Sequence, residues 1–323
     1  MELPVGQVRV KHWRPYRRGL GSCLMARAGG GRQEGAKRGD NRASGLLWGS
    51  VLLGGILAAG VVLAPRLRES SDEKVSPVEI APEETRGLGA APIVEELAVR
   101  VVRKYPHADD AFTQGLIWHG GVLYESTGQY GGSSLRRVRL EDGTILAERK
   151  LESDLFGEGL ALVGQHLVQL TWREGVAVVS DVGSLEERKR LRYAGEGWGL
   201  CFDGTSLVMS DGSSILEFRD PETMELVREV TVSKNGRPVP RLNELECVGS
   251  DVYANIWQRQ EILRIDAATG RVTGSIDASN LLSRREALRA DVLNGIAYKP
   301  ETDTFLLTGK LWPHVFEVEL VPR

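Results

Sequence analysis

The sequence predicts an all-β fold, a five-bladed β-propeller, on three observations. A Gly-rich pattern recurs along the chain, and aligning its copies at positions 115, 159, 199, 245 and 295 gives spacings of 44, 40, 46 and 50 residues. Each unit contains short apolar runs typical of strands, separated by turn signals, and helical periodicity is nearly absent. A period of this length with four short strands per unit is the sequence sign of a propeller.

Three segments of different composition precede the repeats. Residues 1–44 hold ten Lys or Arg against three acidic residues and are rich in glycine, so we expect a basic disordered leader. Residues 45–64 carry no charge, and such a run is long enough to cross about 30 Å of hydrocarbon as a helix. Residues 65–92 contain Pro, Ser, Glu and Arg with little periodicity, which indicates a linker.

The basic flank before residues 45–64 predicts a retained transmembrane anchor. Its N-terminus would stay in the cytoplasm, and the propeller would lie outside the cytoplasm, in a periplasmic or other extracytoplasmic space. A cleaved signal peptide is the alternative, because small residues end the segment, although Pro65 directly after it would hinder cleavage. Met25 offers a second start with a shorter basic leader.

Residues 93–323 form the predicted propeller. The last repeat ends at Arg323 with three evident strands, so we expect residues 93–106, which have a strand pattern, to supply the outer strand of the fifth blade. This closure would remove the free sheet edges of an open ring. In each unit a Gly-rich first strand leads to a second, an alternating third and, after a turn such as Asp142-Gly143, a fourth. One short helix is expected at 284–289.

Composition, histidine spacing and cysteine positions limit the partners and cofactors that we expect. The net charge is −3, and the repeat region has no basic stripe with interleaved aromatics, so we expect no nucleic-acid partner. The histidines are scattered and give no zinc-ligand spacing, so no metal or other cofactor is expected at the site, although a structural calcium is compatible with the channel. Cys201 and Cys247 occupy the same point of successive repeats, inside apolar strands. We expect two buried free thiols there rather than a disulfide.

The first strands of a propeller converge on a central channel, so polar residues near the starts of the repeats can meet there. A purely structural ring would favour Val or small residues at equivalent positions, whereas here these residues differ from unit to unit. Glu158 stands between two glycines; it is either a functional carboxylate facing the ring or a structural one that binds backbone amides. The tryptophans are either pocket walls or packing. The candidates are Phe112, Gln114, Glu125, Glu158, Trp172, Trp198, Asn243, Glu244, Glu246, Asn255, Trp257, Asn294 and Lys310.

Eight segments form an ordered set across about residues 105–320: FTQGL at 112–116, GEGL at 157–160, LTW at 170–172, GEGWGL at 195–200, LNELE at 242–246, ANIW at 254–257, LNGIA at 293–297 and TGKLWP at 308–313. Together they resemble the plant- and bacterial-type glutaminyl-peptide cyclotransferases. The resemblance implies a five-bladed propeller that converts the N-terminal glutamine of peptides or proteins to pyroglutamate and releases ammonia. This family is unrelated to the zinc-dependent animal enzymes of the same activity. Residues 1–90 have no counterpart in the resemblance.

The resemblance also implies roles for individual residues. Glu158 is its candidate for a carboxylate that moves the proton from the attacking amine to the leaving nitrogen. Asn243 and Lys310, with Gln114, would hold the γ-amide or stabilise the oxyanion. An aromatic wall would enclose the small side chain, formed by Phe112, Trp172, Trp198 and Trp257. We expect a monomer whose membrane contact is limited to the N-terminal anchor.

Two other classes stay open on the residues alone. A metal-dependent, lactonase-like propeller hydrolase would need carboxylates and amides that converge on a calcium ion, and Glu158, Asn243, Asn255 and Asn294 could supply them. A non-catalytic propeller could instead serve as a scaffold for a membrane complex in the cell envelope. Activity on a glutaminyl dipeptide in the presence of EDTA would separate the three.

Overall fold

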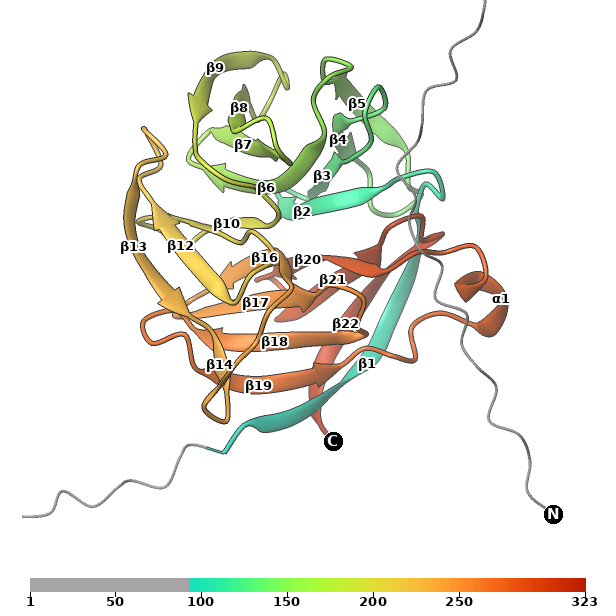
Figure 1. Ribbon diagram of the computed structural model, residues 1–323. Coiled ribbons are helices and arrows are strands. Elements are labelled where there is room, and N and C mark those ends of the chain that lie inside the picture. The colour runs from blue at the N-terminus through green and yellow to red at the C-terminus, as the bar shows by residue number, and fades with distance from the viewer. Residues whose placement is uncertain (1–92) are drawn as a thin grey trace, which may run out of the picture. The chain divides into compact units, whose positions relative to one another are not determined.

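The computed structural model describes residues 93–323 (Figure 1). The predicted leader, membrane segment and linker at 1–44, 45–64 and 65–92 lie outside the described residues. Within residues 93–323, no helix is long and apolar enough to span a membrane. The only helix in this range is α1 (Arg284–Ala287), which begins at a capping box between Ser283 and Glu286 and confirms the short helix expected there.

Twenty strands form five four-stranded antiparallel units around a common centre, in an all-β, propeller-like arrangement (Figure 1). The first unit contains β2 (Thr113–His119), β3 (Val122–Thr127), β4 (Ser134–Val138) and β5 (Ile145–Lys150). The second contains β6 (Gly157–Val163), β7 (His166–Thr171), β8 (Val176–Asp181) and β9 (Glu187–Arg192). The third contains β10 (Leu200–Phe202), β11 (Leu207–Met209), β12 (Ile215–Arg219) and β13 (Leu226–Thr231). A small hairpin, β14 (Ser233–Lys234) and β15 (Arg237–Pro238), follows the third unit.

The fourth and fifth units are joined through the strand that closes the ring. The fourth contains β16 (Leu242–Val248), β17 (Asp251–Ile256), β18 (Glu261–Asp266) and β19 (Val272–Asp277). The fifth contains β20 (Leu293–Lys299), β21 (Thr304–Gly309), β22 (His314–Pro322) and β1 (Glu95–Pro106). Strand β1 pairs antiparallel with β22 and, through residues 95–98, parallel with β19. The N-terminal part of the propeller therefore completes the last unit, as the sequence predicts.

Four of the turns between third and fourth strands use the same local chemistry. An aspartate Oδ1 accepts a hydrogen bond from a backbone N–H two or three residues later, at Asp142, Asp181, Asp220 and Asp266. A residue with positive φ follows in each turn, and two of these are Gly143 and Gly270. Asp side chains favour such turns because they satisfy backbone donors that the strands leave unpaired. These turns set the lengths of the outer hairpins.

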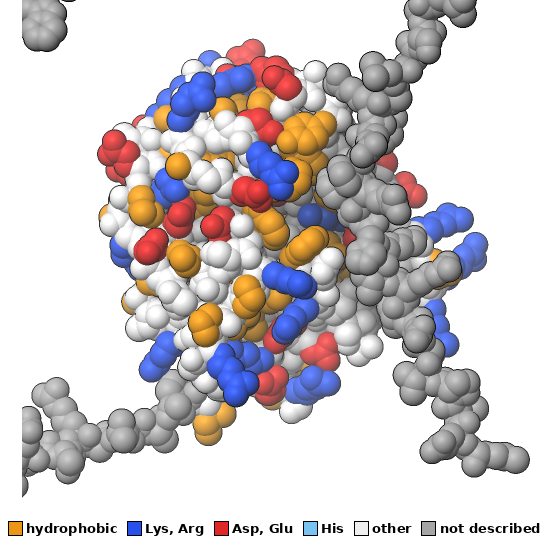
Figure 2. Space-filling view, in the orientation of Figure 1, with side chains coloured by type: hydrophobic (Ala, Val, Ile, Leu, Met, Phe, Trp, Pro, Cys, Tyr) orange, Lys and Arg blue, Asp and Glu red, His pale blue; other side chains and the backbone are white. Residues whose placement is uncertain are grey.

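Buried apolar side chains fill the space between neighbouring units. One such cluster combines Phe218 of the third unit with Leu245, Val252 and Ile265 of the fourth. Charged side chains of both signs are interspersed over the face shown in Figure 2. The fold therefore stacks its sheets face to face around the ring and leaves the ends of the channel as the places where polar side chains can gather.

Cys201 and Cys247 form a disulfide, so the expectation of two free thiols is wrong. Cys201 lies in β10 and Cys247 in β16, the first strands of adjacent units, and their Cα atoms are 5.5 Å apart. First strands approach one another closely near the channel, and this separation falls in the range that a disulfide spans. The equivalent repeat positions, taken in the sequence as a sign of similar burial, are in fact neighbours in space.

Candidate active site

A β-bulge recurs at the start of the first strand in four of the five units. In β2 and β3, Thr113 pairs with Thr127 but Gly115 pairs with Ser126, so Gln114 is an extra residue. The same one-residue shift occurs within residues 157–160, 242–245 and 293–296. Bulges are frequent beside active sites because they re-aim a side chain without ending the strand. Here they carry Gln114, Glu158, Asn243 and Asn294, while Trp198 stands at the aligned position of the third unit.

A second set of aligned positions follows the end of each second strand. These positions are occupied by Gly128, Trp172, Gly212, Trp257 and Lys310. In an antiparallel hairpin the start of the first strand and the end of the second lie at the same end. Both sets therefore lie at one end of the channel, and the five central strands β2, β6, β10, β16 and β20 meet in the middle of Figure 1. Eight of the residues that the sequence selected from separate repeats fall in these two sets: Gln114, Glu158, Trp172, Trp198, Asn243, Trp257, Asn294 and Lys310.

Glycines let the central strands approach this closely. A Cβ atom on Gly159 would lie 2.5 Å from the backbone N of Leu200, and one on Gly199 would lie 1.9 Å from the backbone O of Asn243. Both distances are shorter than any real contact, so only glycine fits between the second, third and fourth units. The backbone N of Gly159 also donates to the carbonyl of Trp198 at 2.7 Å. The two glycines thereby fix the ring that presents Glu158 and Asn243.

Glu158 is 5% exposed, and its Oε1 accepts a hydrogen bond from Nε2 of Gln114 at 2.9 Å. Gln114 is in turn oriented by Asn294, whose Nδ2 donates to Oε1 of Gln114 at 3.2 Å and to the carbonyl of Thr113 at 3.0 Å. Gln114 accepts through its amide oxygen and donates through its amide nitrogen, whereas Asn294 donates both of its hydrogen bonds through Nδ2. Because Asn294 occupies the Gln114 oxygen, the Gln114 amide nitrogen is the atom that faces the carboxylate of Glu158.

Burial decides the proton affinity of Glu158 and Lys310. Removal from water raises the pKa of Glu158 well above its usual value, the positive charge of Lys310 opposes that rise, and Glu196 and Glu174 add to it. Burial lowers the pKa of Lys310, against the charge of Glu158. The Lys310 ammonium also lies 4.8 Å from the centre of the Phe112 ring. The carboxyl group can therefore take up and release a proton nearer to neutral pH than an ordinary glutamate.

The aromatic residues predicted to form a wall make ring contacts at this end, and one carboxylate that the sequence analysis missed contacts two of them. Oε2 of Glu196 accepts from the indole Nε1 of Trp172 at 2.9 Å and from that of Trp198 at 3.1 Å. The Trp198 and Trp257 rings meet edge to face with centres 5.7 Å apart. Phe156, also missed, lies 5.5 Å from the Trp172 ring. The GEGWGL segment contains Glu196, but its role depends on contact with a tryptophan 24 residues earlier.

Two amide oxygens at the bulges have no hydrogen-bond partner within residues 93–323. These are Oδ1 of Asn243 and Oδ1 of Asn294, both fully buried atoms. An unpartnered buried acceptor is costly, so most such groups find a donor. A ligand with N–H groups can supply one at this ring. Asn243, a predicted catalytic residue, therefore keeps an unused acceptor at the ring.

The other candidate carboxylates have structural partners. Two backbone N–H groups, those of Leu116 at 3.3 Å and Ile296 at 2.8 Å, donate to Glu244. Burial raises the pKa of Glu244 as well, so a raised pKa alone does not distinguish Glu158. What distinguishes Glu158 is its contact with an oriented side-chain amide instead of with backbone groups of neighbouring strands. Glu244 instead links the fourth unit to the first and fifth.

Glu125, Glu246 and Asn255 are likewise engaged. Glu125 accepts from Nε2 of His107 at 2.9 Å and from Oγ1 of Thr113 at 2.7 Å. Burial opposes the ionisation of both partners, but their mutual attraction raises the pKa of His107 and lowers that of Glu125. The backbone N of Tyr298 donates to Glu246 at 2.8 Å, and that of Gly295 to Asn255 Oδ1 at 2.9 Å. The sequence analysis missed His107 because its partner, Glu125, lies 18 residues later in β3.

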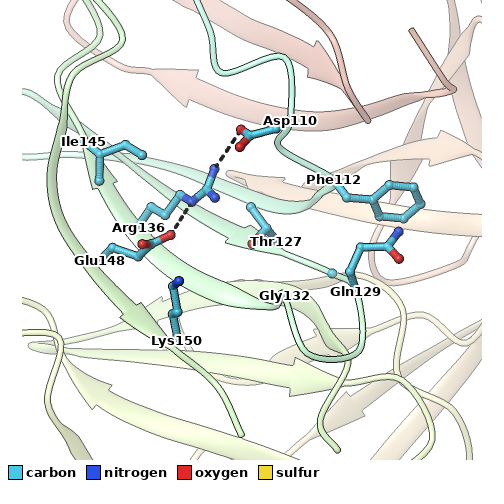
Figure 3. A pocket seen from close by; sticks show the side chains of 10 residues that line it. Asp110, Phe112, Thr127, Gln129, Gly132, Arg136, Ile145, Glu148 and Lys150 are labelled. Carbon is cyan, nitrogen blue, oxygen red and sulfur yellow. Dashed lines mark hydrogen bonds and ion pairs between the residues drawn. The ribbon is translucent and has the colours of Figure 1, made fainter. Parts of the chain in front are cut away.

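A cavity of about 450 Å³ adjoins the ring at the first unit and does not include Glu158, Asn243 or Lys310. Phe112 and Gly128 line it, together with Arg136 and Lys150 (Figure 3). Among residues 93–323, no three His, Cys, Asp or Glu side chains are grouped as a metal site would group them. The ring of bulges, with the cavity beside it, is the candidate site.

Residues 77–320 match the family model for glutamine cyclotransferase. The chain belongs to the glutamine cyclotransferase family. This confirms the resemblance carried by the eight sequence segments. Glutaminyl-peptide cyclotransferase of Arabidopsis thaliana is 41% identical over 227 residues, which cover 69% of this chain and 71% of that protein. The solved glutaminyl cyclase of Myxococcus xanthus is 43% identical, with a TM-score of 0.68, and the match covers 72% of this chain and 100% of the other.

Membership of the glutamine cyclotransferase family agrees with the site described above. The match with the Myxococcus structure covers that whole chain, so the entire solved cyclase has a counterpart here. The family model ends at residue 320, which lies in β22 of the closing unit. The fold, the ring of bulges and the aromatic wall therefore lie inside the region shared with the family.

Proposed function

We propose that this chain is a glutaminyl-peptide cyclotransferase, which cyclises the N-terminal glutamine of peptides or proteins to pyroglutamate and releases ammonia. The observation that carries the proposal is Glu158, a buried carboxylate at the centre of a family-matched ring, paired with an oriented amide of Gln114. The reaction joins the α-amine of glutamine to its own γ-amide carbon. Because it is intramolecular, the site has to fold the substrate back on itself and move protons, without a covalent nucleophile.

The proton movements follow from the position of Glu158. The neutral α-amine attacks the γ-carbonyl carbon, a C–N bond forms, and the carbonyl oxygen takes up negative charge. Glu158 accepts the proton from the attacking nitrogen and delivers it to the γ-nitrogen, which then leaves as ammonia while the carbonyl re-forms. A carboxyl group with a pKa raised toward neutrality by burial serves both steps. No proton is gained or lost overall, so Glu158 returns to its starting state.

The remaining ring residues orient the substrate and stabilise the negative charge that develops on its carbonyl oxygen. Oδ1 of Asn243 accepts from an N–H of the substrate, which satisfies an otherwise unpartnered buried oxygen. Lys310, buried at the same end of the channel, supplies positive charge for the developing oxyanion. Trp172, Trp198 and Trp257 wall the pocket around the folded glutamine side chain, and Phe112 lies beneath the Lys310 ammonium.

A calcium-dependent hydrolase is less well supported by the same residues. Of its four suggested ligands, Asn255 already uses its oxygen for the backbone N–H of Gly295. The positive charge of Lys310 acts on Glu158 and would repel a divalent cation there. We therefore propose that catalysis uses no metal cofactor. Full activity after extensive EDTA treatment is expected, and loss of activity that calcium restores would favour the hydrolase chemistry.

The test of the proposed function is ammonia release from a glutaminyl dipeptide amide by the purified chain, with Glu158→Gln as the decisive variant. Glutamine at position 158 keeps the shape and a hydrogen-bonding oxygen but cannot accept the amine proton. Loss of general acid–base catalysis typically costs about 10²- to 10⁴-fold in kcat. Glu186→Gln, on an exposed side chain of the second unit, is the matched control. An unmutated chain that releases no ammonia refutes the activity, and an active Glu158→Gln variant refutes only the shuttle.

We also propose that residues 45–64 anchor the enzyme in a membrane with the propeller outside the cytoplasm. The uncharged run and its basic flank favour this topology. The Cys201–Cys247 disulfide supports it independently, because disulfides persist mainly in oxidising compartments. The chain should sediment with membranes, resist salt extraction and be digested by protease only from the extracytoplasmic side. Recovery as a soluble chain that starts near Pro65 would instead indicate a cleaved signal peptide.

A further inference from the structure

The cavity beside Phe112 contains a buried cation with unused hydrogen-bonding capacity. Nε of Arg136 contacts Glu148 at 2.9 Å and Ser134 Oγ at 3.0 Å. Its Nη1 atom is fully buried and has no hydrogen-bond partner within residues 93–323. Nη1 lies 3.9 Å from Oδ1 of Asp110, which is an ion pair but too long for a hydrogen bond. An N–H of this buried guanidinium therefore lacks an acceptor beside the cavity that Arg136 lines.

A second cation lies on the same side of the cavity. Lys150 is an exposed lining residue, and no ion pair or hydrogen bond joins its ammonium to another described residue. Figure 3 shows its side chain directed toward the same part of the cavity as Arg136 and Glu148. Glu148 is already engaged by Arg136, and the side chain of Asp110 is 81% exposed, so its charge is screened by water. The arrangement suits a carboxylate that displaces Asp110 from Nη1.

The cavity lies within reach of a substrate whose first residue occupies the ring. Phe112 belongs to both, since its ring lies against Lys310 and its side chain lines the cavity. Gly128, another lining residue, packs so closely that an added Cβ would lie 2.8 Å from the carbonyl oxygen of Gly157, which immediately precedes Glu158. An extended peptide advances about 3.3–3.6 Å per residue. The residues that follow the glutamine can therefore reach a cavity that shares Phe112 with the ring.

We propose that this cavity is a subsite for an acidic side chain in the second or third position of the substrate, bound by Arg136 and Lys150. The inference rests on the proposed cyclotransferase function and adds a substrate preference to it. Arg136 provides a directed N–H and Lys150 a flexible charge, while Phe112 covers the apolar part of the side chain. Asp110 occupies the position of the incoming carboxylate in the free enzyme and competes with it.

The experiment compares kcat/KM of the full chain for peptide amides that differ in one residue. Gln-Glu-Ala, Gln-Gln-Ala and Gln-Lys-Ala vary the second position, and Gln-Ala-Glu, Gln-Ala-Gln and Gln-Ala-Lys vary the third. Turnover of Gln-Ala-Ala amide establishes the parent activity separately. We expect Glu to exceed Gln by about threefold or more in one of the two series, the size typical of a partly exposed ion pair, and Lys to be the poorest. The preference should fall at high salt.

Variants assign the preference to the cavity. Lys150→Glu should remove or reverse the Glu-over-Lys ratio, and Asp110→Asn should increase the Glu-over-Gln ratio because a competitor is lost. Lys189→Gln, on an exposed lysine of the second unit, is the control and should leave both ratios unchanged. Equal kcat/KM for Glu, Gln and Lys in both series overturns the proposal while Gln-Ala-Ala is still turned over. A preference for Glu that Lys150→Glu and Asp110→Asn leave intact also overturns it, since the selectivity would then arise elsewhere.

Discussion

Gln114 donates a hydrogen bond from Nε2 to Oε1 of Glu158 across two neighbouring units, at 2.9 Å. Its own Oε1 is occupied by Asn294, so the Gln114 amide has a fixed orientation. A donor aimed at a carboxylate favours the ionised form, in opposition to burial, which favours the neutral form. We therefore expect the Gln114 amide to oppose the effect of burial, which raises the pKa of Glu158.

Replacing Gln114 by Leu should raise the pKa of Glu158 further. The base form is then reached only at higher pH, so the acidic limb of the kcat/KM profile should move upward. We expect kcat/KM at neutral pH to fall roughly tenfold or more, because a hydrogen bond to a charged group is lost. The measurement is ammonia release against pH, with circular dichroism to verify folding. An acidic limb that stays in place would show that Gln114 does not tune Glu158.

Asn294→Leu tests whether orientation of the Gln114 amide matters. Without Asn294, the Gln114 amide can rotate and present its oxygen to Glu158, which is repulsive. We expect a smaller shift of the same acidic limb in the same direction. If Asn294 acts only through Gln114, the double variant should behave like Gln114→Leu alone, whereas independent residues would give additive losses in log kcat/KM. Additive losses would assign Asn294 a separate contact with the substrate.

Glu158→Gln should also change the pH dependence of stability. The pKa of Glu158 is raised in the folded state, so the native protein keeps a proton that the unfolded chain has already lost. The native state is therefore penalised as pH rises above the unfolded value of about 4.3, by at most about 1.4 kcal/mol per pH unit. Glutamine removes this penalty. Loss of the carboxylate also lowers the pKa of Lys310 further, which destabilises the variant where the ammonium is charged. This cost becomes smaller as the pH rises, so it too makes the stability of the variant increase with pH relative to the unmutated chain.

The expected result is a melting temperature of Glu158→Gln that exceeds that of the unmutated chain by an increasing margin from pH 4 upward. Thermal unfolding at a series of pH values measures it. Glu186→Gln, at an exposed position, should show little change at any pH. A difference that does not vary with pH would mean that Glu158 titrates alike in the folded and unfolded states, contrary to its burial.

Much of the fold and ring could be predicted because both depend on local signals that repeat. Glycines such as Gly159 and Gly199 mark the close approach of central strands, and polar residues near the starts of the repeats mark the ring. The closing role of β1 followed from counting strands in the last unit. The bulge itself was not predicted, because a one-residue register shift leaves the local sequence pattern of a strand almost unchanged.

Contacts between units were harder to predict. Glu196 binds the indoles of Trp172 and Trp198, and His107 pairs with Glu125, but neither partnership has a fixed sequence spacing. The prediction of two free thiols was wrong for a related reason. Equivalent positions in the repeats indicated similar burial of Cys201 and Cys247, but not that adjacent first strands bring them within bonding distance. The role of Glu158 was distinguishable from that of Glu244 only when their partners, a side-chain amide and two backbone N–H groups, were known.

The Glu196 carboxylate offers a test of the aromatic wall. Glu196→Gln replaces one hydrogen-bond acceptor oxygen by an NH₂ group that cannot accept from an indole, so Trp172 and Trp198 should lose a shared anchor. We expect KM for a glutaminyl dipeptide to rise several-fold with a smaller change in kcat, because the wall acts mainly in binding. Tryptophan fluorescence should report greater indole mobility. An unchanged KM would mean that ring packing alone positions the two tryptophans.

The disulfide should contribute measurably to stability because it closes a loop between two units. Cysteines 46 residues apart are joined, and such cross-links typically contribute roughly 2–4 kcal/mol to the free energy of unfolding. The double variant Cys201→Ala/Cys247→Ala should therefore unfold at lower urea concentration, and dithiothreitol should lower the midpoint of the unmutated chain similarly. Dithiothreitol should leave the double variant unchanged. If it lowers that midpoint too, the reductant acts elsewhere.

Closure by β1 gives the last prediction. Strand β1 pairs with β22 from Leu97 to Pro106, and its Tyr105 is 5% exposed, with its hydroxyl 2.6 Å from Oε2 of Glu317. A chain that lacks residues 1–92 keeps all of these contacts and should stay soluble, cooperative in unfolding and active. A chain that lacks residues 1–106 loses the outer strand of the fifth unit, exposes the edges of β22 and β19 and leaves Glu317 without Tyr105. We expect this second chain to aggregate, as measured by size-exclusion chromatography and light scattering. Two truncations with the same solubility and melting temperature would show that the ring does not need β1 to close.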